Sequence, residues 1–190
     1  EPHSLIFGVG TDGDLAALAY YPEQNVLGWA RMPMTGAVVE CVQSVPAPDG
    51  RSDDLWLIVR RTINGATVRY VEVLRQPLAD DAEQEDAFYV DSGVTYDGAP
   101  TTTITGLTHL EGQTVTDGAT HPTRTVSAGS ITLQRQASVA HVGLPYTATI
   151  AGMDLEAGAG NGTAQGKVKR IYRIAVRLLR TLGGRAGTAE

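Results

Sequence analysis

Cysteine is nearly absent from the chain, which excludes two classes of protein. Cys41 is the only cysteine in 190 residues, so the chain can form neither an internal disulfide framework nor a thiolate metal cluster of its own. We expect Cys41 to be a small buried residue, because a free cysteine usually packs like an apolar side chain. A membrane-spanning helix is not expected either, because no apolar run approaches the roughly 18 residues that such a helix needs.

The residue patterns of common catalytic and metal sites are also missing. No Gly-x-Ser-x-Gly sequence occurs, so a serine nucleophile of that kind is not expected. Residues 8–13 match the dinucleotide-binding fingerprint in their letters, but Pro22 would end the required helix after about two turns. The histidines lack zinc-binding spacing; they are His3, His109, His121 and His141. We therefore predict a protein without catalytic residues, cofactor or metal.

The composition favours strands joined by tight turns. The chain has 22 glycines and 9 prolines but only 2 phenylalanines, and threonine and valine are abundant. Charge is divided unevenly, because residues 1–90 carry 6 basic and 14 acidic side chains and residues 91–190 carry 9 basic and 7 acidic ones. The fold class predicted from these features is all-β, with antiparallel hairpins in the first part of the chain.

Strand patterns follow one another through residues 1–79. Residues 4–7 and 15–21 read as strands around an Asp12-Gly13 turn, with a short helix over 14–21 as the alternative. Residues 15–32 read as a second hairpin and 37–45 as a further strand. Asn64-Gly65 separates two β-rich runs and predicts a type I′ hairpin, because both of its positions need positive φ. We expect Val68 and Tyr70 on the face opposite to that of Arg69, Val71 and Val73.

One four-stranded meander over about 15–75 would resemble a single propeller blade. A blade needs sister blades to close a propeller, and only one such unit is visible. The chain does not begin with Met, and Glu1-Pro2-His3-Ser4 lacks the regions of a signal peptide. We therefore expect an excerpt of a longer protein.

The acidic stretch 80–87 is the expected linker between two domains. It holds five acids, and clustered like charges repel and remain solvated. A calcium loop is the alternative, although the ordered Asp-x-Asp-x-Asp-Gly spacing is missing. After it, short runs rich in threonine and valine alternate with glycine turns, which predicts a small β-sandwich or β-barrel over 88–190.

The end of this second domain is basic. No acid lies between Glu156 and Glu190, and a strand is favoured over a helix here because β-branched residues are frequent and Gly183-Gly184 follows. Such a strand can contact DNA phosphates or present a charged edge to a neighbouring subunit, and both readings stay open. The residues that would form this surface are Lys167, Lys169, Arg170, Arg173, Arg177 and Arg180.

Several stretches resemble a known family. Residues 20–31 fit Tyr-x-x-Glu-Gln-x-Val-x-Gly-Trp, a strand pair of the tail nozzle, or tail tubular B, proteins of short-tailed bacteriophages and related prophages. Residues 54–65 with 69–72 look like the next hairpin of these proteins, and the similarity continues through 96–98, 106–112 and 142–146. One departure is the short stretch 113–118, where a few residues would be missing relative to the family.

The resemblance implies a C-terminal fragment of a virion structural protein. Such a protein carries a β-propeller, forms a ring with other copies of itself around the tail axis, and lets DNA pass. Its partners would be further virion tail proteins, and its location the phage tail or the bacterial cytoplasm when a prophage expresses it. The alternative is a carbohydrate- or receptor-binding β module, which needs exposed aromatic side chains. We expect the candidates for such a platform to be core residues instead; they are Tyr20, Tyr21, Trp29 and Trp56.

Overall fold

The computed structural model describes residues 4–48, 50, 52–75, 78, 82–83, 86–118, 121–152, 173–179, 181 and 184–187. The chain divides into two units, Glu1–Tyr146 and Thr147–Glu190, and all named strands lie in the first. The strands pair antiparallel, and within the described residues the named helical elements are short 3-10 turns. The all-β prediction is therefore confirmed.

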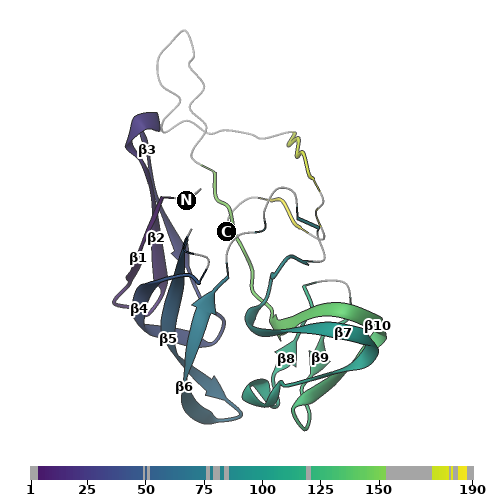
Figure 1. Ribbon diagram of the computed structural model, residues 1–190. Coiled ribbons are helices and arrows are strands. Elements are labelled where there is room, and N and C mark those ends of the chain that lie inside the picture. The colour runs from purple at the N-terminus through teal and green to yellow at the C-terminus, as the bar shows by residue number, and fades with distance from the viewer. Residues whose placement is uncertain are drawn as a thin grey trace. The chain divides into compact units, whose positions relative to one another are not determined.

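The first three strands form one sheet in the order β1-β2-β3 (Figure 1). They are β1 (Leu5–Val9), β2 (Leu15–Tyr21) and β3 (Val26–Met32). The turn η1 (Pro22–Gln24) joins the last two, and Asn25 closes it in the left-handed region at φ 54°. Because β2 pairs with both neighbours along its length, the alternative of a helix over 14–21 is wrong.

The next three strands form a second sheet in the order β4-β5-β6. These are β4 (Ala37–Pro46), β5 (Asp53–Ile63) and β6 (Ala66–Leu74). The predicted Asn64-Gly65 hairpin is confirmed, since φ is 48° at Asn64 and 77° at Gly65 and the flanking residues Ile63 and Ala66 pair. A β-bulge between Val39 and Cys41 shifts the register of β4 against β5.

The single four-stranded meander expected over 15–75 is not what forms. Strand β3 pairs with β2 alone, and β4 pairs with β5 alone, so the chain changes sheets between Met32 and Ala37. The reason is a shared core, because the two sheets bury apolar side chains against each other. Its fully buried members are Leu15, Val39, Leu57 and Val59, with Phe7, Met32, Met34, Ala37, Val42 and Leu55 partly buried around them.

Residues 91–144 form a third group of strands within the same unit. The long strands β7 (Asp91–Thr105) and β10 (Ser130–Leu144) pair antiparallel, with β8 (Thr114–Val115), β9 (Arg124–Thr125) and the turn η3 (Thr108–Leu110) between them in sequence. A second apolar core lies here, joined by Ile63 of β5. It is formed by Ile63, Ile104, Leu107, Leu110, Val115, Val126, Ile131, Leu133, Ala140, Val142 and Leu144.

Short strands separated by glycine turns were expected in this region, and that expectation is wrong for three glycines. Gly93 and Gly98 lie inside β7, and Gly143 lies inside β10. A Cβ on Gly143 would stand 2.7 Å from Cα of Gly93 and 2.6 Å from the carbonyl oxygen of Asp91. The glycines therefore permit two backbones to approach closely instead of turning the chain. The linker expected at 80–87 falls partly outside the described residues, which exclude 80, 81, 84 and 85, and the domain boundary there stays a prediction.

Candidate functional site

The basic strand predicted near the end of the chain is wrong where the structure describes it. Residues 173–179 contain no strand and are exposed, so Arg173 and Arg177 do not lie on a sheet edge. Alternating side chains do not form a strand without a partner to complete the hydrogen-bond ladder. The other predicted residues, Lys167, Lys169, Arg170 and Arg180, lie outside the described residues.

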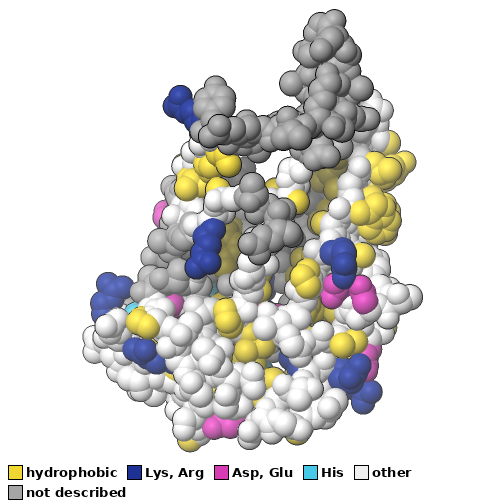
Figure 2. All heavy atoms as spheres, turned by 180° about the vertical axis from the view of Figure 1, so that it is seen from behind, with side chains coloured by type: hydrophobic (Ala, Val, Ile, Leu, Met, Phe, Trp, Pro, Cys, Tyr) yellow, Lys and Arg dark blue, Asp and Glu magenta, His cyan; other side chains and the backbone are white. Residues whose placement is uncertain are grey.

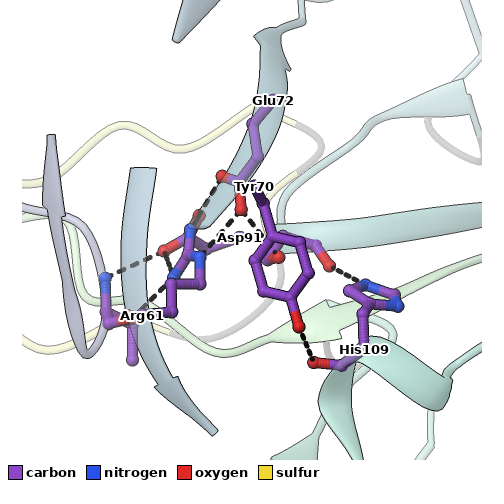
Figure 3. A network of polar contacts seen from close by, with 7 residues as sticks. Arg61, Tyr70, Glu72, Asp91 and His109 are labelled. Carbon is purple, nitrogen blue, oxygen red and sulfur yellow. Dashed lines mark hydrogen bonds and ion pairs between the residues drawn. The ribbon is translucent and has the colours of Figure 1, made fainter. Parts of the chain in front are cut away.

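A buried ionic cluster that the sequence did not reveal joins β5, β6 and β7 (Figure 3). The side chain of Arg61 is 0% exposed. Its Nε and Nη2 donate to the two carboxylate oxygens of Glu72 at 2.8 and 2.9 Å, and Nη2 also donates to Oδ1 of Asp91 at 2.8 Å. Nη1 donates to the carbonyl oxygen of Thr35 at 2.8 Å. All three guanidinium nitrogens therefore have partners.

Further hydrogen bonds extend the cluster. The Thr35 amide donates to Asp91, the Ser92 hydroxyl donates to Glu72, and the Thr35 hydroxyl donates to the carbonyl oxygen of Pro145. Burial opposes the charge of Arg61, but the hydrogen bonds that Arg61 donates to Glu72 and Asp91 outweigh this effect and raise the pKa of Arg61 above its ordinary value. Because the guanidinium is enclosed and fully engaged, we assign the cluster a structural role rather than ligand binding.

The described histidines lie apart from one another and have different partners. His109 contacts the carbonyl oxygen of Ser92 at 2.8 Å, and the Tyr70 hydroxyl donates to the carbonyl of His109 (Figure 3). His121 pairs with Asp117, and His141 contacts the hydroxyl of Thr95. Among the described residues, no group of three or more histidine, cysteine, aspartate or glutamate side chains is placed to hold a metal ion.

One face of the first sheet is apolar and open to solvent. Ile6, Leu18 and Trp29 stand opposite one another across the three strands, and Tyr20 stands opposite Leu27 in the next row. Trp29 and Leu27 are each 67% exposed. Hydrophobic side chains gather over β3 at the upper right of Figure 2. We call these five residues the β1–β3 outer face, because the opposite side of the sheet packs into the core.

The second sheet has a matching face. Across it Cys41, Ile58 and Val71 form one row, and Trp56 and Val73 stand opposite each other in the next. Val71 is 68% exposed and the other four are also exposed. We call these five residues the β4–β6 outer face. The expectation that Cys41 is buried is wrong, because the bulge-shifted register of β4 places it on this face.

The expectation that the aromatic residues form core is wrong for three of the four. Trp29, Trp56 and Tyr20 are exposed, whereas Tyr21 is half-buried. They have strand-forming sequences around them, but they lie on the side of each sheet that faces away from the shared core. Strand assignment alone does not say which of the two faces is covered.

Each outer face ends in a row of charges. Beside Trp29, Arg31 pairs with Asp12 at 2.7 Å and with Asp14; the hydrogen bond that Arg31 donates to Asp14 raises the pKa of Arg31. Beside Ile58 and Val71, Glu40 accepts from Arg60 at 2.9 Å and from Arg69 at 2.7 Å.

The contacts beside the β4–β6 outer face also shift the pKa values of the charged groups that form them. The hydrogen bond from Arg69 lowers the pKa of Glu40, and the same bond raises the pKa of Arg69. Such exposed pairs contribute orientation and specificity more than stability. Both outer faces thus combine apolar surface with a charged border, which is the anatomy of a protein-binding surface.

No protein-family model matches the chain, and no curated protein matches it significantly. None of the helices in the described part of the chain has the length and apolar character to cross a bilayer. A function for the chain is therefore inferred from the positions of its side chains.

Proposed function

We propose that the chain is a non-catalytic structural part of a bacteriophage tail, of the nozzle or tubular kind, which acts by assembling with copies of itself and with other tail proteins. Its location would be the virion, or the bacterial cytoplasm when a prophage expresses it. The observation that carries the proposal is the pair of apolar outer faces on one two-sheet unit, together with the sequence resemblance at residues 20–31 and 54–65.

Exposed apolar surface on both faces points to assembly. Scattered exposed apolar side chains are common, but contiguous patches bordered by polar residues mark interaction sites. On each sheet here the exposed apolar residues are neighbours across the strands, and an ion-paired border adjoins them. Tryptophan, tyrosine and arginine, which dominate the energetics of protein interfaces, are all present on the β1–β3 side.

DNA contact belongs to the same proposal. The run from Lys167 to Arg180 carries six basic side chains and no acid. Nonspecific attraction to phosphates needs such charge and no particular base-reading side chain. The contact would be weak and strongly dependent on salt.

Two measurements test the proposal. Negative-stain electron microscopy of the purified protein should show rings or ordered stacks, and portal, capsid and tail genes should lie beside its gene. A monomer at high concentration, encoded within a metabolic operon, would contradict it.

A carbohydrate- or receptor-binding module is the second candidate, and the exposure of Trp29 and Tyr20 favours it. The neighbours Ile6, Leu18 and Leu27 argue against a sugar, because they offer no hydrogen-bond partner to hydroxyl groups. Glycan-array binding that is lost in Trp29→Ala and kept in Thr103→Ala, an exposed position on β7, would support the sugar module instead of assembly.

A further inference from the structure

The two outer faces share one layout. On the first sheet, the row of Arg31, which is ion-paired to Asp12 and Asp14 from the turn between β1 and β2, adjoins the row Ile6–Leu18–Trp29, and the row Tyr20–Leu27 follows. On the second sheet, a charged row containing Arg60 and Arg69 is followed in the same way by two apolar rows. Those rows are Cys41–Ile58–Val71 and Trp56–Val73, and the second row continues on β4 to the polar side chain of Gln43.

The charged rows have opposite net sign. Arg31 with Asp12 and Asp14 gives one positive and two negative charges, a net of −1. Arg60 and Arg69 with Glu40 give two positive charges and one negative, a net of +1. Two β1–β3 faces placed together would juxtapose like charges, and so would two β4–β6 faces. A β1–β3 face against a β4–β6 face would bring opposite charges together.

The chain already contains a contact of this kind. The inner faces of the same two sheets pack together around Leu15, Val39 and Leu57. The Val39 amide donates to the carbonyl oxygen of Gly13 at 2.8 Å, which places the end of β2 near Asp14 beside the end of β4 near Glu40. The charged ends of the two sheets therefore lie at the same end of the shared core. A further sheet stacked in the same way would match apolar row to apolar row and charged row to charged row.

We propose that the β1–β3 outer face of one copy docks onto the β4–β6 outer face of the next copy. This inference rests on the proposed function and names the partner and the surfaces. The contact is heterologous, because the two surfaces differ, so each copy keeps one free face of each kind. Repetition of the contact builds a closed ring when the rotation between copies closes and an open stack when it does not.

A heterologous contact predicts complementation between two defective copies. Trp29→Lys disables the β1–β3 face, and Val71→Lys disables the β4–β6 face; both side chains are about two-thirds exposed, so the fold should tolerate the change. Each variant alone should sediment as a 20.1 kDa monomer, while the wild type forms larger species. An equimolar mixture should form a dimer and nothing larger, because only one productive pair of faces remains.

Cys41 reports which faces meet in that mixture. Cys41 lies on the β4–β6 outer face and is the only cysteine. After treatment with a thiol reagent, the intact mass of each variant therefore shows whether its own Cys41 has reacted. Cys41 of the Trp29→Lys copy should become protected, and Cys41 of the Val71→Lys copy should stay reactive. Thr103→Lys adds the same charge on β7 and should associate like the wild type. Leu27→Lys and Val73→Lys replace either variant that fails to fold.

The outcomes separate this inference from the proposed function. Association of the wild type without dimerisation of the mixture would overturn the face-to-face pairing and leave assembly standing. Dimerisation of one variant alone would show a contact between like faces and would also overturn it. A wild type that stays monomeric at every concentration would overturn both this pairing and self-assembly, whereas the genes beside it test the tail assignment independently.

Discussion

Arg61 lies between two carboxylates with its side chain fully enclosed, and its environment makes the outcome of a substitution predictable. In Arg61→Met the methylene volume is kept, but Glu72 and Asp91 are left buried beside each other without a counter-charge. Removing one partner from a buried ionic cluster typically costs about 3–5 kcal/mol. Urea unfolding at neutral pH should show a loss of that size.

The neighbouring Arg60 provides the matched control. Its side chain is 41% exposed and bonds to Glu40 on the outer side of the same strand. Arg60→Met removes a positive charge one residue away, so it should lower the free energy of unfolding far less than Arg61→Met does. Equal losses in the two variants would contradict the structural role of the buried cluster.

The lowered pKa of Glu40 predicts how the stability of the fold depends on pH. The hydrogen bond from Arg69 and, after it, that from Arg60 hold the pKa of Glu40 below its ordinary value of 4.5, against the opposing effect of burial. A carboxyl whose pKa is lower in the folded state stabilises the fold above its unfolded pKa and loses that contribution as pH falls through the folded pKa. Wild type and Glu40→Gln should therefore differ in urea stability at neutral pH, and the difference should shrink as pH falls below 4.5 and vanish below the folded pKa. A constant difference across the titration would contradict this.

At the scale of secondary-structure elements, the β5–β6 hairpin depends on its turn. Gly65 has φ 77° and open space around the position of a Cβ, so only backbone strain opposes a side chain there. Gly65→Ala should cost about 1–2 kcal/mol, because L-residues resist the left-handed region. Gly28 in β3 also has open space but no positive φ, so Gly28→Ala should be neutral or slightly stabilising. Thermal unfolding of the pair should show shifts of opposite sign or, at the least, a loss in Gly65→Ala alone.

The same hairpin shows how far the sequence predicts the fold. Asn64-Gly65 and the alternation over 66–74 specify the turn and the two faces locally, and both predictions are confirmed. The long strands β7 and β10 were missed, because Gly93 and Gly143 read as turns until their close approach is seen. That approach depends on residues 50 positions apart, which no local pattern encodes.

Arg61 and the outer faces were missed for related reasons. In alternation Arg61 shares a face with Val59 and Ile63, which was a signal that it points inward. Its partner Asp91 lies 30 residues away, so the compensation for burying the charge was invisible. Strand alternation predicts which residues share a face of each sheet, but it does not predict which of the two faces is buried. That depends on the change of sheets between Met32 and Ala37, which brings the two inner faces together.

At the scale of the whole molecule, two kinds of interaction can drive binding, namely apolar burial and attraction to DNA phosphates. They respond differently to salt. The outer faces are apolar with charged rows of net −1 and +1, whereas the run 167–180 carries six positive charges. Apolar burial is insensitive to sodium chloride and is strengthened by sulfate. Contacts with DNA phosphates weaken steeply as salt rises, because they depend on counterion release.

Salt therefore separates assembly from DNA contact in one preparation. Self-association measured by sedimentation should change little between low and high sodium chloride and should rise in ammonium sulfate. Any binding to a random duplex, followed by fluorescence anisotropy, should fall steeply over the same range of sodium chloride. Trp29→Lys should abolish self-association and leave DNA binding unchanged, because the change lies on the β1–β3 outer face. Self-association that collapses as sodium chloride rises would show that charge, and not the two apolar faces, holds the copies together.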